Sequence, residues 1–88
     1  MAELHEHRIK RLKMRSMRRG IKEMDLILQR FAEAHLDGMA EADLGLYDAM
    51  LSENDHDLYQ WVTLQAAPPE RYAGLIDDIV ASLPETRG

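Results

Sequence analysis

The spacing of apolar residues constrains this chain more than any other feature of its sequence. Near the C-terminus, six apolar side chains recur at the i, i+3, i+4, i+7, i+8 and i+11 positions of a helix: Tyr72, Leu75, Ile76, Ile79, Val80 and Leu83. Burying all six would contribute on the order of 10 kcal/mol before conformational entropy is subtracted. No segment alternates with a period of two for long enough to indicate a strand. The sequence therefore predicts an all-α protein.

Four earlier segments show the same helical period, at about residues 6–18, 21–36, 40–51 and 55–65. Gly38 is expected to end the second helix in the left-handed conformation, and either Asn54 or Asp55 to cap the fourth. Pro69 is expected to open the fifth, because a first helical position needs no amide hydrogen. The short connections favour antiparallel neighbours. We therefore predict a small five-helix bundle, with residues 1–88 forming a single domain.

The charge of the chain is divided unevenly. Residues 1–22 carry eight Lys and Arg against two acids, a net charge of +6, whereas residues 23–88 carry −11. The basic segment can either steer a partner, with Arg11 and Arg15 as steering residues, or fold onto the chain's own acidic surface. It also suggests an alternative function, a nucleic-acid-binding or toxin-neutralising helical protein. Against nucleic acid, the segment has no aromatic residue for base stacking, and the acidic remainder would repel a polyanion.

Catalysis, metal binding and membrane insertion have no pattern to support them. The chain has no cysteine, no glycine-rich phosphate loop, and no histidine–carboxylate spacing suited to a metal. No apolar run approaches the ~20 residues that cross a bilayer, and no secretory signal is visible. Its histidines are expected to be a terminal pair, a half-buried packing residue and a residue beside a helix cap: His5 and His7, His35, and His56. Five methionines are expected to fill the core: Met14, Met17, Met24, Met39 and Met50.

The most informative stretch is Arg19-Gly20-Ile21-Lys22-Glu23, followed by Asp25. Gly20 lies where a basic helix gives way to a helix that begins with acids. A glycine there permits a backbone conformation that a Cβ would resist, and it lets another surface approach closely. Glu23 and Asp25 complement the dipole of the second helix. On these grounds alone the stretch is either an ordinary inter-helix turn or a contact surface.

Together with a second stretch, this motif resembles the succinate dehydrogenase assembly factors that promote covalent FAD attachment, which include bacterial flavinylation factors and mitochondrial assembly factor 2. The first signature is Arg19-Gly20-x-x-Glu23 with Asp25, and the second is an acidic turn that leads into Asp57-Leu58-x-x-Trp61. The order, the spacing and the chain length agree, and the resemblance spans about residues 8–83.

The resemblance implies an assembly factor, or chaperone, that is not itself an enzyme. Its members bind the flavoprotein subunit of succinate dehydrogenase, and in bacteria also that of fumarate reductase, and they favour the joining of FAD to a client histidine. Carried over to this chain, the resemblance places Arg19, Gly20 and Glu23 against the client, with Asp25 beside them. FAD would belong to the client, with no cofactor bound tightly by this chain, and the protein would reside in the cytoplasm.

For three residues of the second signature, the sequence leaves two possible roles open. Asp55 and Asp57 are either helix caps or contacts with the client. Trp61 is expected to be a buried packing residue, with a client contact as the alternative.

Overall fold

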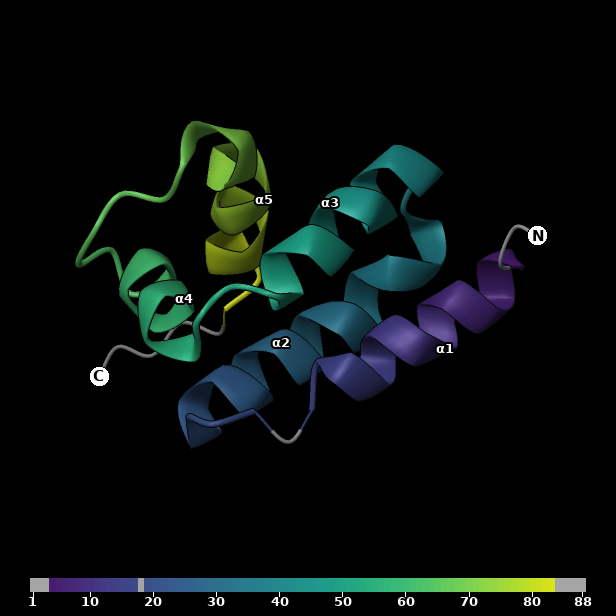
Figure 1. The fold of residues 1–88 in the computed structure, drawn as a ribbon, viewed down its shortest axis with the longest axis horizontal. Coiled ribbons are helices and arrows are strands. Elements are labelled where there is room, and N and C mark those ends of the chain that lie inside the picture. The colour runs from purple at the N-terminus through teal and green to yellow at the C-terminus, as the bar shows by residue number, and fades with distance from the viewer. Residues whose placement is uncertain (1–3, 18, 84–88) are drawn as a thin grey trace.

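The computed structural model of the chain describes residues 4–17 and 19–83 (Figure 1). Its helices are α1 (His5–Arg15), α2 (Lys22–His35), the short 3-10 helix η1 (Leu36–Gly38), α3 (Glu41–Leu51), α4 (Asp55–Val62) and α5 (Glu70–Ala81). The described residues contain no strand. The prediction of a small all-α protein with five α-helices is therefore confirmed. None of the described helices is both long and apolar enough to cross a membrane.

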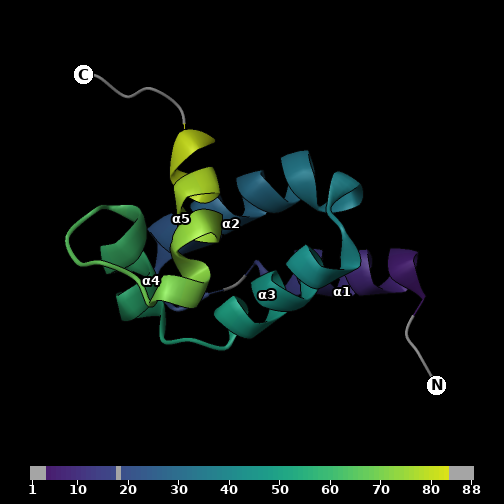
Figure 2. The same cartoon turned by 90° about the horizontal axis from the view of Figure 1, so that it is seen from above.

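The helices form two groups that share one core. α1 packs against α2 and α3, and these helices run along the longer part of the molecule in Figure 1. α4 and α5 pack against each other at one end, and α5 also contacts α2 and α3. Figure 2 shows the same arrangement from above, with α5 crossing α2. As a consequence, the start of α4 lies close to the segment that joins α1 to α2.

The core draws its side chains from every α-helix. Four of the six periodic residues near the C-terminus are buried in α5, whereas Val80 in α5 and Leu83 after it are only half-buried. Trp61 in α4 is 7% exposed, and its ring centroid lies 6.1 Å from that of Tyr72. The expectation that Trp61 is a packing residue is therefore confirmed. Its burial leaves little of the indole for a partner protein to contact.

The prediction that Met14 fills the core is wrong. Its side chain is 63% exposed, because α1 buries only a narrow stripe against its neighbours. Met24 and Met50 are buried as expected, and Met17 and Met39 are half-buried. His35 is also more exposed than expected, although its ring lies against that of Phe31 at 4.7 Å between centroids.

Several helix ends differ from the prediction. α1 ends at Arg15, and α5 begins at Glu70 with Pro69 as its N-cap and not as its first helical residue. Gly38 is not left-handed, because the chain continues from α2 into η1, and no described glycine has a positive φ. α4 ends at Val62, because Leu64 adopts a left-handed φ of 64°. The N–H of Gln65 then donates to the carbonyl of Gln60 at 2.8 Å, the bond that closes a Schellman motif. Leu64 fills a position that usually belongs to glycine.

Two buried hydroxyl groups join α1 to α3. Ser16, which caps α1 and is 0% exposed, has its Oγ 2.6 Å from the Tyr47 hydroxyl and donates to the carbonyl of Leu12 at 2.8 Å. Burial raises the pKa of Tyr47 to about 12, although the hydrogen bond with Ser16 acts in the opposite direction. The phenol of Tyr47 therefore stays protonated in the folded protein to about pH 12.

This buried phenol makes stability fall at alkaline pH. The unfolded chain loses the proton of Tyr47 near pH 10, whereas the folded chain keeps it to about pH 12. The stabilisation is fully present below pH 10 and is lost between pH 10 and 12, by about 2–3 kcal/mol. Urea unfolding at several pH values should show this decline, and Tyr47→Phe should flatten it. Tyr59→Phe, which leaves the buried pair intact, is the control. An equal flattening by both variants would contradict the assignment.

Candidate functional site

Asp55, the first residue of α4, brings the two sequence signatures together. Its Oδ1 accepts a hydrogen bond from Arg19 Nε at 2.9 Å and lies 2.7 Å from Arg19 Nη2. Its Oδ2 accepts from the backbone N–H of Gly20 at 2.5 Å, across 35 positions of sequence. Asp55 can receive both because Asn54 caps α4, its side chain accepting from the N–H of His56 at 2.8 Å. Asp55 of the second signature thus holds the glycine turn, residues 19–21, through contacts with Arg19 and Gly20.

Arg19 also binds the C-terminal ends of two helices, α1 and α3, through its guanidinium. Nη2 donates to the carbonyl of Leu51, the last residue of α3, at 2.9 Å, and Nη1 donates to the carbonyl of Arg15, the last residue of α1, at 3.1 Å. Carbonyls at helix ends lack partners within the helix and carry partial negative charge, so a cation suits them. The Arg19 side chain is only 12% exposed. These contacts give Arg19 a positioning role, while its contact with a client stays a prediction.

Gly20 is exposed, and space explains the glycine better than backbone conformation does. Its φ is not in the left-handed region. A Cβ built at Gly20 would lie 3.2 Å from Asp55 Oδ2, closer than an ordinary van der Waals contact. A side chain here would press on the carboxylate that holds the turn, and it would also cover the backbone from outside. Gly20 therefore keeps the turn tight and accessible at once.

The acidic residues around the turn differ in exposure. Glu23 is exposed in the first turn of α2, where its charge complements the helix dipole. Asp25 is half-buried, and its Oδ1 is buried without a hydrogen-bond partner in the described part of the chain. Asp57 is exposed in the first turn of α4. The turn therefore offers Gly20 and Glu23 to a partner, with Arg19 and Asp55 beneath them.

The basic helix α1 is folded onto the acidic side of α3. Arg11 Nη2 lies 3.1 Å from Asp48 Oδ2, and Arg15 forms a short ion pair with the same carboxylate. Arg8 Nη1 lies 2.8 Å from Glu41 Oε1. Burial opposes ionisation of Asp48, but the hydrogen bond from Arg11 and the charges of the arginines outweigh it and lower the pKa of Asp48.

Of the two interpretations of the basic segment, folding onto the acidic surface is the one that the structure supports. Arg11 and Arg15, proposed as steering residues, both pair with Asp48, and a role in the encounter with a partner stays a prediction. Among the described residues of this segment, Arg8, Arg11 and Arg15 are paired with acids of α3, so the structure gives no support to the alternative nucleic-acid function. One signal for this pairing is visible in the sequence: two arginines lie four positions apart on one helix face.

The described residues hold no group of three or more His, Asp or Glu side chains placed to bind a metal ion. The features brought together at the glycine turn are an accessible backbone, an exposed carboxylate and a rigid support. Such an arrangement suits recognition of another protein, because a surface held in place before binding loses less conformational entropy on association.

Comparison with known proteins identifies the family. A family model described as flavinator of succinate dehydrogenase matches residues 10–83. The mitochondrial succinate dehydrogenase assembly factor 2 of Meyerozyma guilliermondii is 46% identical over 61 residues, covering 69% of this chain and 45% of that protein. The protein of the same name from Candida glabrata is 48% identical over 65 residues, covering 70% and 42%.

The corresponding protein of Danio rerio is 36% identical over 80 residues, covering 89% of this chain and 51% of that protein. The chain thus spans about half the length of the curated relatives that it matches. The family model, in contrast, covers both signatures and part of every helix from α1 to α5. The chain therefore belongs to the family of succinate dehydrogenase flavinators.

Proposed function

We propose that the chain is an assembly factor that binds the flavoprotein subunit of succinate dehydrogenase and promotes covalent attachment of FAD to a histidine of that client. The family match over residues 10–83 is the observation that carries this proposal. The relatives are named as succinate dehydrogenase assembly factors, which supports the same role. The flavoprotein subunit of fumarate reductase is a second proposed client.

The glycine turn is the proposed client-binding surface. Gly20 admits the client backbone closely, and Glu23 supplies an exposed carboxylate for a charged hydrogen bond. Arg19 and Asp55 hold this surface in one geometry, with Asp25 as a flanking carboxylate. Binding that is stronger to the flavinylation-competent conformation shifts the client toward it. The flavin supplies the bond-forming chemistry, so the factor itself needs no catalytic residue.

Two further attributes belong to the proposal. FAD stays with the client, and the factor binds no cofactor tightly. Residence in the cytoplasm remains a prediction, because the relatives are named as mitochondrial proteins.

The direct test measures covalent flavin on the client. Cells that lack their own factor receive this chain, and the flavoprotein subunit is separated under denaturing conditions and examined for in-gel flavin fluorescence. Restored fluorescence is the expected result. Fluorescence that stays at the level of the empty vector, with the chain expressed and folded, would contradict the proposed function.

Glu23→Ala tests the exposed carboxylate of the turn. The fold should lose only about 0.3–1 kcal/mol through the helix dipole. A charged contact at a desolvated interface is worth about 2–5 kcal/mol, so flavinylation should drop severely. Glu33→Ala, an exposed glutamate further along α2, is the matched control and should restore fluorescence fully. If Glu23→Ala also restores it fully, Glu23 is not a client contact.

A further inference from the structure

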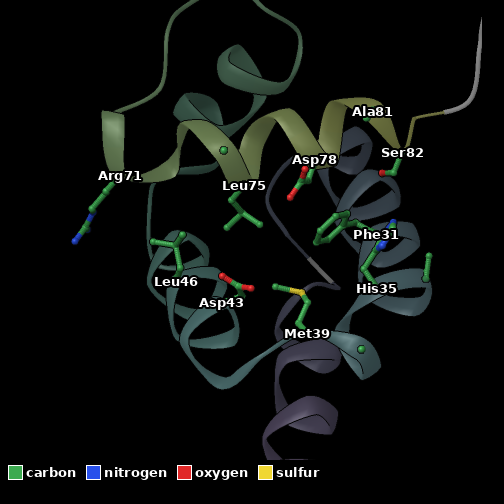
Figure 3. Close-up of a pocket in the computed structure, with 13 residues that line it drawn as sticks. Phe31, His35, Met39, Asp43, Leu46, Arg71, Leu75, Asp78, Ala81 and Ser82 are labelled. Atoms are coloured by element: carbon green, nitrogen blue, oxygen red, sulfur yellow. The ribbon is translucent and has the colours of Figure 1, made fainter.

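A second surface of the molecule is hollowed between α3 and α5. This groove has a volume of about 880 Å³ and is closed at one end by the last turn of α2 and by η1 (Figure 3). Its apolar floor consists of Phe31, Met39, Leu46 and Leu75. All of its described lining residues come from α2, η1, α3 and α5 or the residues next to them, and none from the glycine turn. The α3–α5 groove is therefore separate from the proposed client-binding surface.

Two carboxylates face each other across this groove. Figure 3 shows Asp43 of α3 and Asp78 of α5 pointing toward its middle from opposite sides. Both are exposed, and neither forms an ion pair with a described residue. Arg71 lies at one end and points away, over the Tyr72 ring at 4.6 Å from its centroid. This charge disfavours phosphate-bearing ligands and favours a cation.

Gly74 leaves room for another backbone to approach the wall of the groove closely. It lies in the middle of α5, on the wall of the groove, where glycine weakens a helix relative to alanine. Its φ is not positive, and a Cβ placed there would meet no described residue within 4 Å. Neither the backbone conformation nor the packing of the described residues requires a glycine at that position. A closely approaching helix would require one.

We propose that the α3–α5 groove binds a basic amphipathic helix of a partner protein. Apolar side chains of that helix would lie on Met39, Leu46 and Leu75, as helices do in apolar grooves. Its Lys or Arg residues would pair with Asp43 and Asp78, and its backbone would approach Gly74. The groove and the glycine turn then form two independent binding surfaces on one small protein.

The probe is a synthetic helix of about 18 residues, five helical turns, made of Leu, Ala and Lys with leucines on one face. It is titrated into the ¹⁵N-labelled full chain while amide resonances are recorded. Saturable shifts are expected at Met39, Leu46 and Gly74, with the Gly20 amide unchanged. A matched peptide with Glu in place of Lys should not bind. Absence of saturation by about 1 mM of the Lys peptide overturns the proposal.

Variants of the chain distinguish binding of the peptide in the groove from nonspecific electrostatic attraction of a basic peptide to an acidic protein. Asp43→Asn with Asp78→Asn should weaken binding of the Lys peptide by about tenfold. Asp77→Asn removes the same charge from an exposed neighbour that does not line the groove, and should change the affinity by less than about twofold. Equal losses for Asp77→Asn and for Asp78→Asn alone overturn the proposal.

Gly74→Ala provides a test in which stability and binding change in opposite directions. Alanine should raise the thermal unfolding midpoint, because it favours the helix and fits into open space. The same Cβ should weaken peptide binding several-fold. Unchanged binding in this variant overturns the close approach at Gly74. Concentration-dependent shifts of the groove amides without peptide would assign the groove to a second copy of the chain and likewise overturn the proposal.

Discussion

Gly20→Arg is expected to abolish covalent flavinylation of the client while the protein stays folded. Gly20 is exposed on the glycine turn, so a long side chain there projects into the space that the client would occupy. Among the described residues beyond its chain neighbours, the new Cβ meets only Asp55 Oδ2 within 4 Å, at 3.2 Å, and a carboxylate can give way slightly. We therefore expect a cost to the fold of about 1 kcal/mol and a near-complete loss of function.

The assay is in-gel flavin fluorescence of the client subunit in cells lacking the native factor, with circular dichroism of the purified variant to verify the fold. Gln29→Arg adds the same side chain at an exposed position of α2 and should remain active. Gly20→Ala should fall between the two. Full fluorescence from a folded Gly20→Arg variant would reduce the glycine turn to a connection between helices.

Asp55→Ala is expected to give the largest loss of stability, about 2–4 kcal/mol. The substitution removes the acceptor of the Gly20 N–H and the ionic partner of Arg19, whose side chain is only 12% exposed. A cation left unpaired at that depth is costly, whereas the total stability of a small domain is only about 5–15 kcal/mol. Urea unfolding followed by Trp61 fluorescence measures the change, because this indole is buried in the fold.

Asp57→Ala is the matched control for this change. It removes an exposed acid from the same first turn of α4 and should cost only about 0.3–1 kcal/mol. A double-mutant cycle with Arg19→Ala then isolates the coupling between Arg19 and Asp55. If the two single losses simply add, the ion pair does not hold the turn and the positioning role of Arg19 is wrong.

The helices could be predicted from the sequence because their apolar residues repeat locally. The buried residues of α3, Leu44, Tyr47, Met50 and Leu51, follow the helical period, and the structure buries all four. The sequence-based predictions were wrong at positions where the surrounding residues decide which way a side chain faces or how a helix ends. Met14 is apolar yet faces away from the core, and Gly38 was assigned a left-handed helix end that η1 replaces.

The candidate site could be found but not explained from the sequence. Glu23 and Asp25 were placed correctly in the first turn of α2, because dipole complementarity is a local rule. The partnership of Arg19 and Gly20 with Asp55 was missed, since it joins residues about 35 positions apart. The sequence left Asn54 and Asp55 open as the cap of α4; Asn54 is the cap, and the Asp55 carboxylate binds Arg19 and Gly20.

The dependence of the glycine turn on Asp55 also bears on synthesis of the protein. A ribosome extends a chain at about 5–20 residues per second, so Gly20 emerges several seconds before Asp55. Until α4 has emerged and docked, the Gly20 N–H and most of the Arg19 guanidinium lack the partners that hold them. The nascent chain therefore cannot hold the turn in its final geometry until the residues of α4 have been synthesised and have packed against it.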